Sequence, residues 1–324
     1  MRVVTLGEIM LRLTPPGVLR LGQAESFEVQ YGGAEANVAV ALANFGEETS
    51  FVSAVPANAV GQAAIDSLRR RGVDTRFVLR GGSRLGIYFL ERGVSQRAGG
   101  VVYDRADSAF ACSEASQYDW EAIFRGADWL HFTGITPALG ERAEEVVRQA
   151  CAAAKKAGAT ISCDLNFRNK LWDKERAGAV MGELLSFADV CIANEHQVAE
   201  LFGAKEEDAA AYLADRYPFR AIALSKRRTI SATVNVVGGS LYREGKKAAS
   251  REYQVEMAER IGGGDAFAAG VIYGLRKHFG LQKTAEFAAA CCCLKHTVVG
   301  DCCLFSAKEA EDLAEGKNSF GVRR

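Results

Sequence analysis

The sequence predicts an α/β fold in which helices cover both faces of a mostly parallel sheet. Six short apolar segments have the length and composition of buried strands: Val3–Leu6, Thr49–Val52, Trp129–Phe132, Thr160–Cys163, Val190–Ala193 and Ala221–Leu224. Between most of them lie Ala-rich amphipathic stretches that predict helices: Ala36–Asn44, Ala59–Arg71, Arg142–Ala157 and Lys174–Leu185. Strands that alternate with helices in this way favour a parallel sheet, because each crossover places a helix on one face.

Two parts of the chain break this alternation and predict a smaller sheet. Residues near 11–31 and 75–107 contain strand-like sequence without helices. The candidate strands in the second part are Arg76–Arg80, Gly86–Glu91 and Val101–Asp104. We interpret these parts as a small β-structure that projects from the main sheet as a lid. Because the chain has no internal repeat, low-complexity tract or flexible linker, we expect residues 1–324 to form one domain with this appendage.

The composition argues against several classes of function. The 324 residues are 48% hydrophobic, which is enough for a large buried core, and 40 basic residues balance 40 acidic ones. No nucleic-acid partner is therefore expected, and the clusters Arg69–Arg71 and Lys226–Arg228 are interpreted as solvated faces. No apolar run approaches the roughly 18–20 residues of a membrane span. Residues 1–7 predict an opening strand rather than a signal peptide, so we expect a soluble cytoplasmic protein without a membrane partner.

The cysteines are predicted to be free thiols. There are nine: Cys112, Cys151, Cys163, Cys191, Cys291, Cys292, Cys293, Cys302 and Cys303. An odd count with adjacent runs is not a disulfide framework. The cluster at 291–303 also suggests a metal site, but three adjacent ligands do not match zinc spacing. We favour packing in a buried helix, because cysteine behaves as a small apolar side chain.

The segment 261–270 carries the strongest indication of chemistry. Gly262, Gly263 and Gly264 precede Asp265 and a run of small apolar residues that predicts a helix. Such a turn can direct several backbone N–H groups and the positive end of a helix at one anion. Asp265 is then placed to accept a proton from a group that attacks the anion, as phosphoryl transfer requires. The alternative is an ordinary strand–helix turn in which the aspartate caps the helix.

A second glycine motif, Tyr31-Gly32-Gly33-Ala34-Glu35-Ala36-Asn37, precedes a predicted helix of small residues. It predicts either a tight turn at a helix start or a close approach of the backbone to a small polar ligand. The chain contains no G-x4-G-K-[ST] phosphate loop. The second motif also lacks the G-x-G-x-x-G spacing of a dinucleotide site.

Together, the two glycine motifs resemble the N-terminal and C-terminal signatures of the ribokinase/PfkB-type carbohydrate kinases, and the likeness extends over nearly the whole chain. Within that family the chain most resembles 2-keto-3-deoxygluconate kinases. The segments that carry this closer likeness are Gly32–Glu35, Tyr88, Tyr103–Arg105, Thr133–Leu139, Asp164–Arg168 and Leu171–Trp172. The resemblance implies a ribokinase-like three-layer core with a mostly parallel sheet, plus a small β-sheet lid.

The resemblance also implies roles for individual residues. Asp265 would be the general base that deprotonates a sugar hydroxyl, and the amides of Gly262, Gly263 and Gly264 would stabilise the transferring phosphoryl group. Arg168 would reach the substrate or the phosphates; its alternative is a structural ion pair with an acid.

Substrate contacts are implied on both sides of the site: Gly33, Ala34 and Asn37 from the first motif, and Tyr88, Tyr103 and Arg105 from the lid. An arginine fork suits a carboxylate because it can bind both oxygens. The two tyrosines could equally be a cross-strand packing pair. We favour function for Tyr103 and Arg105, since strand alternation places both on one face.

ATP contacts are implied at Asn194, Ser225, Gly262, Gly264 and His296. His296 would line the adenine pocket, although a single histidine is more often a structural residue. The cofactors implied are ATP and Mg2+, with a monovalent cation as an option and no metal held tightly by protein ligands.

The sequence departs from the family pattern at several of these positions. Glu259 and Arg260 precede the glycines, where the family usually has an aspartate or similar residue, and Gly263 stands where alanine is usual. The family's N-x-x-E element, which orders magnesium and phosphate through water, has Gln197 in place of the acid; Glu195 or Glu200 could substitute. The segment Leu224–Ile230 lacks the glycine that usually follows the nucleotide-binding strand.

We therefore expect an ATP-dependent sugar-acid kinase that phosphorylates a terminal hydroxyl, with 2-keto-3-deoxygluconate as the leading substrate. The alternatives are a kinase of another sugar such as fructose or ribose, a nucleoside kinase, a non-catalytic sugar-binding regulator, and a redox or metal sensor built on the cysteine cluster. A homodimer through the lid is expected, because uncovered sheet edges favour pairing with another subunit.

Overall fold

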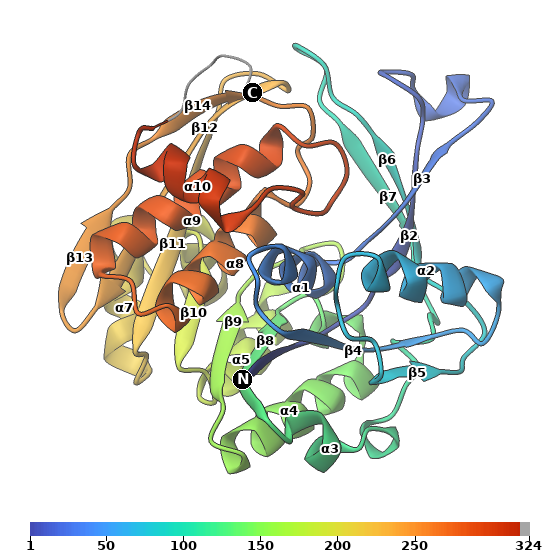
Figure 1. The fold of residues 1–324 in the computed structure, drawn as a ribbon, viewed down its shortest axis with the longest axis horizontal. Helices are drawn as coiled ribbons and strands as arrows, with labels where there is room; N and C mark the ends of the chain where they lie inside the picture. The colour runs from blue at the N-terminus through green and yellow to red at the C-terminus, as the bar shows by residue number, and fades with distance from the viewer. Residues whose placement is uncertain (318–324) are drawn as a thin grey trace.

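A ten-stranded sheet runs through the centre of the molecule in the computed structural model, which describes residues 1–317 (Figure 1). Its strands are β1 (Arg2–Leu6), β4 (Thr49–Val55), β5 (Val78–Arg80), β8 (Ala127–Thr133), β9 (Thr160–Asp164), β10 (Val190–Ala193), β11 (Ala221–Thr229), β12 (Val234–Arg243), β13 (Lys246–Ala249) and β14 (Tyr253–Glu256). They follow the order β13-β12-β11-β10-β9-β8-β1-β4-β5, and β14 pairs with β12. The strands from β11 to β5 pair in parallel, whereas β12, β13 and β14 are antiparallel additions.

Helices cover both faces of this sheet. They are α1 (Ala34–Asn44), α2 (Ala59–Arg69), α3 (Trp120–Phe124), α4 (Glu141–Lys156), α5 (Lys174–Leu185), α6 (Glu195–Phe202), α7 (Ala209–Arg216), α8 (Gly263–Arg276), α9 (Leu281–His296) and α10 (Ala307–Ala314). Helices α3 to α7 share one apolar core with the sheet, and α1, α8, α9 and α10 share another. The α/β fold predicted from the alternation of strands and helices is confirmed, as are all six predicted strands and four predicted helices.

Alternation along the strands explains why two cores form. In β1, Val4 and Leu6 face the first core while Val3 faces the second, and in β8 Leu130 and Trp129 are divided in the same way. Successive side chains of a strand point to opposite faces, so a strand that is covered on both sides must be apolar throughout. This is why the short apolar runs identified buried strands correctly.

A separate four-stranded sheet, with the order β3-β2-β6-β7, stands at the upper right of Figure 1. Its strands are β2 (Met10–Thr14), β3 (Glu28–Gly32), β6 (Ile87–Glu91) and β7 (Gly100–Asp104). The expected small sheet therefore exists, but one of its predicted strands was wrong. Residues 78–80 of the segment Arg76–Arg80 form β5, which pairs in parallel with β4 at the edge of the main sheet. Sequence alone does not distinguish the two locations, because pairing partners are set by tertiary contacts.

The cysteine cluster packs inside the second core, as predicted. Cys291, Cys292 and Cys293 lie in α9 and are almost entirely buried, and Cys303 packs beside them. All nine cysteines are free thiols. Burial raises the pKa of Cys291 well above its ordinary value, so the thiol stays protonated and behaves as an apolar group. Among residues 1–317, no helix has the length and apolar character needed to span a membrane.

Candidate active site

A cleft of about 960 Å³ lies between the carboxyl ends of the parallel strands and the small sheet. Glu8 follows β1, Asp164 ends β9 and Asn194 follows β10, and all three line it. Loops after parallel strands meet at one edge of the sheet, which is where ligands bind in open α/β folds. The predicted site residues that line this one cleft are Gly33, Ala34, Asn37, Tyr88, Tyr103, Arg105, Arg168, Asn194, Ser225, Gly262, Gly263, Gly264 and Asp265.

The three glycines open helix α8, as the sequence predicted. Gly262 caps the helix with φ 84°, and a Cβ there would lie 2.2 Å from the carbonyl oxygen of Asp301. Both facts require glycine. A Cβ on Gly264 would meet nothing within 4 Å. The start of α8 thus lines the cleft with free backbone N–H groups and the positive end of the helix.

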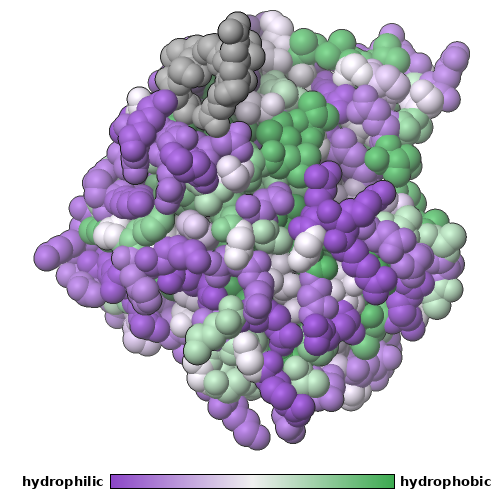
Figure 2. Space-filling model, in the orientation of Figure 1, coloured by the Kyte–Doolittle hydropathy of each residue, from purple (hydrophilic) through white to green (hydrophobic). Residues whose placement is uncertain are grey.

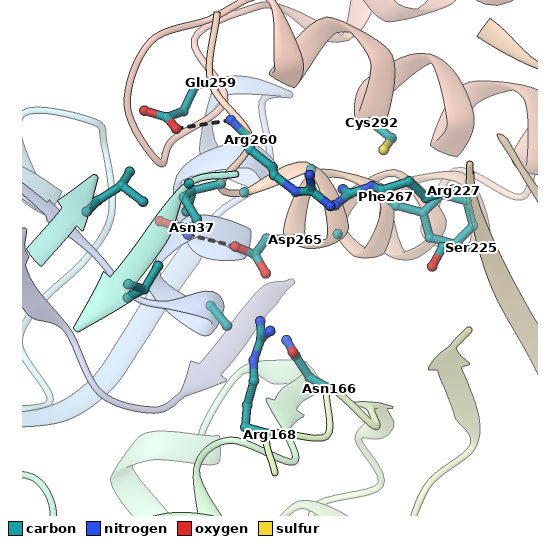
Figure 3. Close-up of a pocket in the computed structure, with 18 of the residues that line it drawn as sticks. Asn37, Asn166, Arg168, Ser225, Arg227, Glu259, Arg260, Asp265, Phe267 and Cys292 are labelled. Carbon is teal, nitrogen blue, oxygen red and sulfur yellow. Dashed lines mark hydrogen bonds between the residues drawn. The ribbon is translucent and has the colours of Figure 1, made fainter. Parts of the chain in front are cut away.

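Asp265 occupies the first turn of α8 and is held by Asn37. The Asn37 amide donates a 2.7 Å hydrogen bond from Nδ2 to Oδ2 of Asp265, drawn as a dashed line in Figure 3. Burial raises the pKa of Asp265 to about 6, while the Asn37 hydrogen bond and the charge of Arg168 act in the opposite direction. The carboxylate is therefore ionised at neutral pH and only weakly acidic, which suits a general base.

Two further buried carboxylates, Asp164 and Glu35, line the cleft. Asp164 accepts the backbone N–H of Asn166 at 3.1 Å, and burial together with the charge of Asp265 raises its pKa to about 7. Glu35 accepts three hydrogen bonds from Thr133 and Thr136, and burial raises its pKa to about 7.

Arg168 approaches this carboxylate cluster from the opposite side of the cleft. Figure 3 shows Arg168 and Asn166 pointing toward Asp265 from the side of the cleft opposite α8. Within residues 1–317 the Arg168 guanidinium forms no ion pair within 4.0 Å. The alternative of a structural ion pair, which the sequence left open, is therefore not what the described residues form.

The first glycine motif brings two backbone segments into contact. A Cβ on Gly33 would lie 2.0 Å from the carbonyl oxygen of Glu8, and a Cβ on Gly32 would lie 2.1 Å from Oδ2 of Asp301. Gly33 caps helix α1, and Ala34 begins that helix at the cleft wall. Close packing, rather than an unusual backbone angle, makes glycine necessary at both positions.

The lid residues Tyr88, Tyr103 and Arg105 differ in their exposure and in their contacts. Tyr88 and Tyr103 face each other across β6 and β7 with ring centroids 6.0 Å apart, so they do form a cross-strand pair. The Tyr88 hydroxyl is buried and donates a 2.5 Å hydrogen bond to Asp301. The Tyr103 ring is 40% exposed, and the Arg105 guanidinium lies 5.6 Å from its centroid. Tyr103 and Arg105 thus share a face, as expected from alternation.

Arg105 is already paired within the chain. Its Nε donates a 2.8 Å hydrogen bond to Oε2 of Glu8, and its Nη2 contacts the same oxygen. The second carboxylate oxygen of Glu8, Oε1, is buried and has no hydrogen-bond partner among residues 1–317. Glu8 was not identified from the sequence. The available indication was its position directly after the first strand, where parallel sheets place ligand contacts.

A buried ionic network joins the lid to the start of α8. Arg12 of β2 has no exposed surface; its Nη1 donates to Asp301 at 2.9 Å, and its Nη2 pairs with Glu259. Asp301 also accepts the Tyr88 hydroxyl and contributes the carbonyl that packs on Gly262. Removing one partner of such a buried network leaves uncompensated charge, which costs about 3–5 kcal/mol. Buried polar contacts therefore join the lid to the glycine turn that opens helix α8.

Two residues that the sequence predicts to contact ATP, Asn194 and Ser225, line the cleft where β10 and β11 reach it. The side chain of Asn194 caps helix α6 by accepting the backbone N–H of Gln197 at 2.8 Å, and Oε1 of Gln197 accepts the backbone N–H of Asn194 at 3.3 Å. Ser225 donates to the carbonyl of Ala193 at 3.2 Å and lines the cleft. The neutral Gln197 thus serves as a capping residue, which is a structural reason for its presence.

His296 lies behind the cleft wall with no exposed surface. Its Nδ1 is 2.9 Å from the carbonyl oxygen of Glu259, and its Nε2 is 3.2 Å from Nη2 of Arg227. These are the contacts of a structural histidine, and a direct contact with adenine stays a prediction. Arg227 and Arg260 both line the cleft. Arg227 is exposed, as the interpretation of Lys226–Arg228 as a solvated face expected, and it also borders the cleft because strand β11 continues farther than its apolar part indicates.

Comparison with known proteins places the chain among relatives. Residues 1–304 match the pattern of the pfkB family carbohydrate kinases. The chain is 31% identical to the 2-dehydro-3-deoxygalactonokinase of Haloferax volcanii over 99% of both proteins. Its structure resembles the crystal structure of 2-dehydro-3-deoxygluconokinase from Thermotoga maritima, with a TM-score of 0.96 and 45% identity over 98% of this chain and all of that one.

The fold also matches a more distant structure that holds nucleotide. A putative ribokinase II from E. coli in complex with ATP and Mg2+ superimposes with a TM-score of 0.86 over 98% of this chain and 99% of that one. The two are 20% identical, so this likeness concerns the fold, which is the ribokinase-like fold expected from the two glycine motifs.

Proposed function

Because the chain belongs to the PfkB family of carbohydrate kinases, we propose that it transfers the γ-phosphoryl group of ATP to a terminal hydroxyl of 2-keto-3-deoxygluconate or its galactonate epimer. The names of the relatives support a keto-deoxy sugar acid as acceptor. The single observation that carries the mechanism is the start of α8, where Asp265, held by Asn37, stands beside the amides of Gly262–Gly264 in one cleft.

Asp265 acts as the general base in this proposal. A base must be unprotonated, and a pKa of about 6 leaves the carboxylate ionised at neutral pH while keeping its affinity for a proton. Asn37 fixes the carboxylate by occupying Oδ2, which leaves Oδ1 to accept the proton of the acceptor hydroxyl. The backbone N–H groups at the start of α8 stabilise the negative charge that moves from the phosphoryl group to the leaving phosphate.

Magnesium accompanies ATP in this family, and the residues at the cleft suit its usual mode of binding. Within residues 1–317 no group of three His, Cys, Asp or Glu side chains is placed to enclose a metal. Asp164 and Glu195 line the cleft and provide carboxylate oxygens. They would hold Mg2+ together with phosphates and water, since this ion is usually bound by one or two carboxylates and keeps several waters. When bound, Mg2+ neutralises charge on the phosphates.

The sugar acid is proposed to bind under the lid. Arg105 and Tyr103 would contact its carboxylate, and Oε1 of Glu8 offers a buried acceptor for a hydroxyl. Gly33 and Ala34 would contact the sugar through their backbones. The network Arg12–Asp301–Gly262 supports a coupling between lid closure and the geometry of the anion-binding turn. Closure would exclude water and so limit the hydrolysis of ATP.

A homodimer through the lid is part of the proposal. The small sheet exposes apolar side chains, among them Val29 at 59% and Val102 at 55%. Figure 2 shows apolar patches at the upper right, where the lid strands of Figure 1 lie. Exposed apolar surface on an uncovered sheet favours association with a second copy. Sedimentation of wild-type protein and of a Val29→Lys, Val102→Lys variant would test this, with a dimer expected only for the wild type.

The proposed reaction is tested by ADP release from Mg-ATP across a panel of acceptors: 2-keto-3-deoxygluconate, 2-keto-3-deoxygalactonate, gluconate, fructose, ribose and adenosine. A clear preference for the keto-deoxy acids is expected, with the phosphorylated product identified by mass spectrometry. Turnover confined to neutral sugars or adenosine would overturn the substrate while leaving Asp265 as base. Binding of ATP without turnover of any acceptor would favour a non-catalytic regulator.

A further inference from the structure

Two arginines at the nucleotide end of the cleft have no acidic partner. Arg227 projects from β11 and Arg260 lies two residues before Gly262, and both line the cleft. Within residues 1–317 neither guanidinium forms an ion pair with a carboxylate. Figure 3 shows Arg260 extending along the start of α8 toward Arg227. We propose that Arg227 and Arg260 form a clamp for the phosphate chain of the nucleotide, with His296 as the residue that positions Arg227.

The length of strand β11 brings Arg227 to the site. The strand runs from Ala221 to Thr229, whereas its neighbour β10 ends at Ala193, opposite Leu224. Beyond that point β11 is held by β12 alone, with Arg227 opposite Val237. Strand alternation turns Arg228 to the other face from Arg227, and Arg228 does not line the cleft. The segment without glycine therefore places the guanidinium of Arg227, and not that of Arg228, at the start of α8.

His296 holds Arg227 by its ring nitrogens. The Nδ1–H group donates to the carbonyl oxygen of Glu259, which leaves Nε2 as an acceptor for the Nη2–H of Arg227. Burial, and then the charge of Arg227, lower the pKa of His296 to about 4, so the ring is neutral and can accept this bond. A Cβ on Gly263 would lie 2.5 Å from the His296 ring. Glycine at this position makes room for the histidine.

Arg260 is kept from its nearest acid. Glu259 uses Oε1 to accept the backbone N–H of Arg260 at 3.0 Å and directs Oε2 to the guanidinium of Arg12. The Arg260 side chain is therefore left for the cleft. Burial, and then the nearby charge of Arg227, lower the pKa of Arg260. Arginine stays protonated under all such conditions, so both charges persist at neutral pH.

A bound anion with several negative charges would compensate the positive charges of Arg227 and Arg260. Two guanidinium groups near one another, without a counter-ion, repel each other, and the positive end of α8 adds to the same field. A polyphosphate offers many oxygens in the geometry that guanidinium forks bind well. The sugar carboxylate has its own arginine at the lid. The clamp rests on the proposed function, because it assigns the charge at this end of the cleft to the nucleotide of that reaction.

The clamp also connects three departures from the family pattern. Arg260 stands before the glycines, Arg227 lies in the segment without glycine, and Gly263 replaces the usual alanine. In the structure the three positions lie together: Nη2 of Arg227 is 3.2 Å from Nε2 of His296, the His296 ring fills the space that a Cβ on Gly263 would occupy, and Arg260 extends toward Arg227 (Figure 3). They form one arrangement rather than three unrelated substitutions.

Nucleotide binding without any acceptor sugar tests the clamp. Calorimetry would compare ATP, ADP and AMP, each with Mg2+, on wild-type protein, Arg227→Gln, Arg260→Gln and His296→Gln. Arg228→Gln is the matched control, since it removes the same charge from the next residue of the same strand. Near-wild-type melting temperatures would establish that the variants are folded.

We expect each arginine variant to raise the Kd of ATP about 10-fold, in line with the loss of charge-assisted hydrogen bonds. The effect should shrink from ATP to ADP to AMP, and His296→Gln should act in the same direction as Arg227→Gln. Arg228→Gln should change Kd less than 2-fold. Unchanged ATP affinity in both arginine variants, or equal losses for ATP and AMP, would overturn the clamp. Tight ATP binding by the wild type without turnover of any sugar would overturn the proposed reaction instead.

Discussion

The two ends of the cleft use arginine in opposite ways. At the lid end, Arg105 is buried and paired with Glu8, so its charge is neutralised before any ligand arrives. At the end proposed to hold the nucleotide, Arg227 and Arg260 line the cleft without an ion pair to any of residues 1–317, and the neighbouring His296 is neutral. The difference indicates that the lid end recognises its ligand by the fit of preplaced polar groups, whereas the nucleotide end attracts its ligand by charge.

Asp265 lies between the two ends, and its replacement should have the largest effect. Asp265→Asn keeps the shape and the contact with Asn37 but removes the base, so kcat is expected to fall by about 10²–10⁴-fold. The Kd of ATP should change little, because nucleotide affinity resides at the other end. Steady-state kinetics and calorimetry on one preparation would measure both. A variant with near-normal kcat would remove Asp265 from the mechanism.

Arg105→Ala should impair the use of the sugar acid at one end of the cleft and leave the use of ATP at the other end almost unchanged. We expect kcat/KM for 2-keto-3-deoxygluconate to fall about 10- to 100-fold, since a carboxylate loses a charged hydrogen-bond partner and Glu8 is left unpaired. The KM of ATP should stay within about 2-fold, a bound set by the absence of any contact between Arg105 and the nucleotide end. Arg105→Lys is the comparison variant, because it keeps a positive charge beside Glu8 and removes only the guanidinium fork, so its loss should be smaller. An equal loss of activity toward neutral sugars would argue against a carboxylate contact.

The pH dependence of kcat/KM should report the base. Asp265 has a pKa raised to about 6 and must be unprotonated, so activity is expected to rise with pH through about 6 and then level off. Asn37→Ala removes a hydrogen bond that lowers this pKa and should move the acidic limb to higher pH. An acidic limb that stays in place or moves to lower pH in Asn37→Ala would contradict this electrostatic account.

Gly263→Ala should have the smallest effect and act on the nucleotide end alone. Its Cβ would crowd the His296 ring, displacing the residue that holds Arg227. We expect a rise of about 3-fold in the Kd of ATP and a loss of about 1–3 kcal/mol in stability, as overpacking usually causes. Calorimetry and thermal unfolding would measure these. Gly280→Ala is the matched control, since a Cβ there meets nothing within 4 Å and Gly280 lies outside the cleft lining.

Most of the fold followed from the sequence because its signals are local. The apolar run Thr160–Cys163 and the amphipathic stretch Lys174–Leu185 became β9 and α5 with nearly the expected ends. Arg76–Arg80 was assigned to the wrong sheet, since a three-residue edge strand carries no pattern that identifies its neighbour. The site followed in part: glycines and Asp265 form a recognisable motif, whereas Glu8 and Arg260 are ordinary charged residues until their surroundings are known.

The sequence by itself determined where the chain could approach an anion and where a base would stand, because glycine and aspartate act through their own backbone and their nearest neighbours. Only the tertiary structure decided which charges are neutralised. Arg105 meets Glu8 across 97 positions, Arg12 meets Asp301 across 289, and Arg227 meets His296 across 69. Such pairings depend on the packing of separate elements, and a periodic pattern in one segment holds no information about the partner that another segment will bring to it.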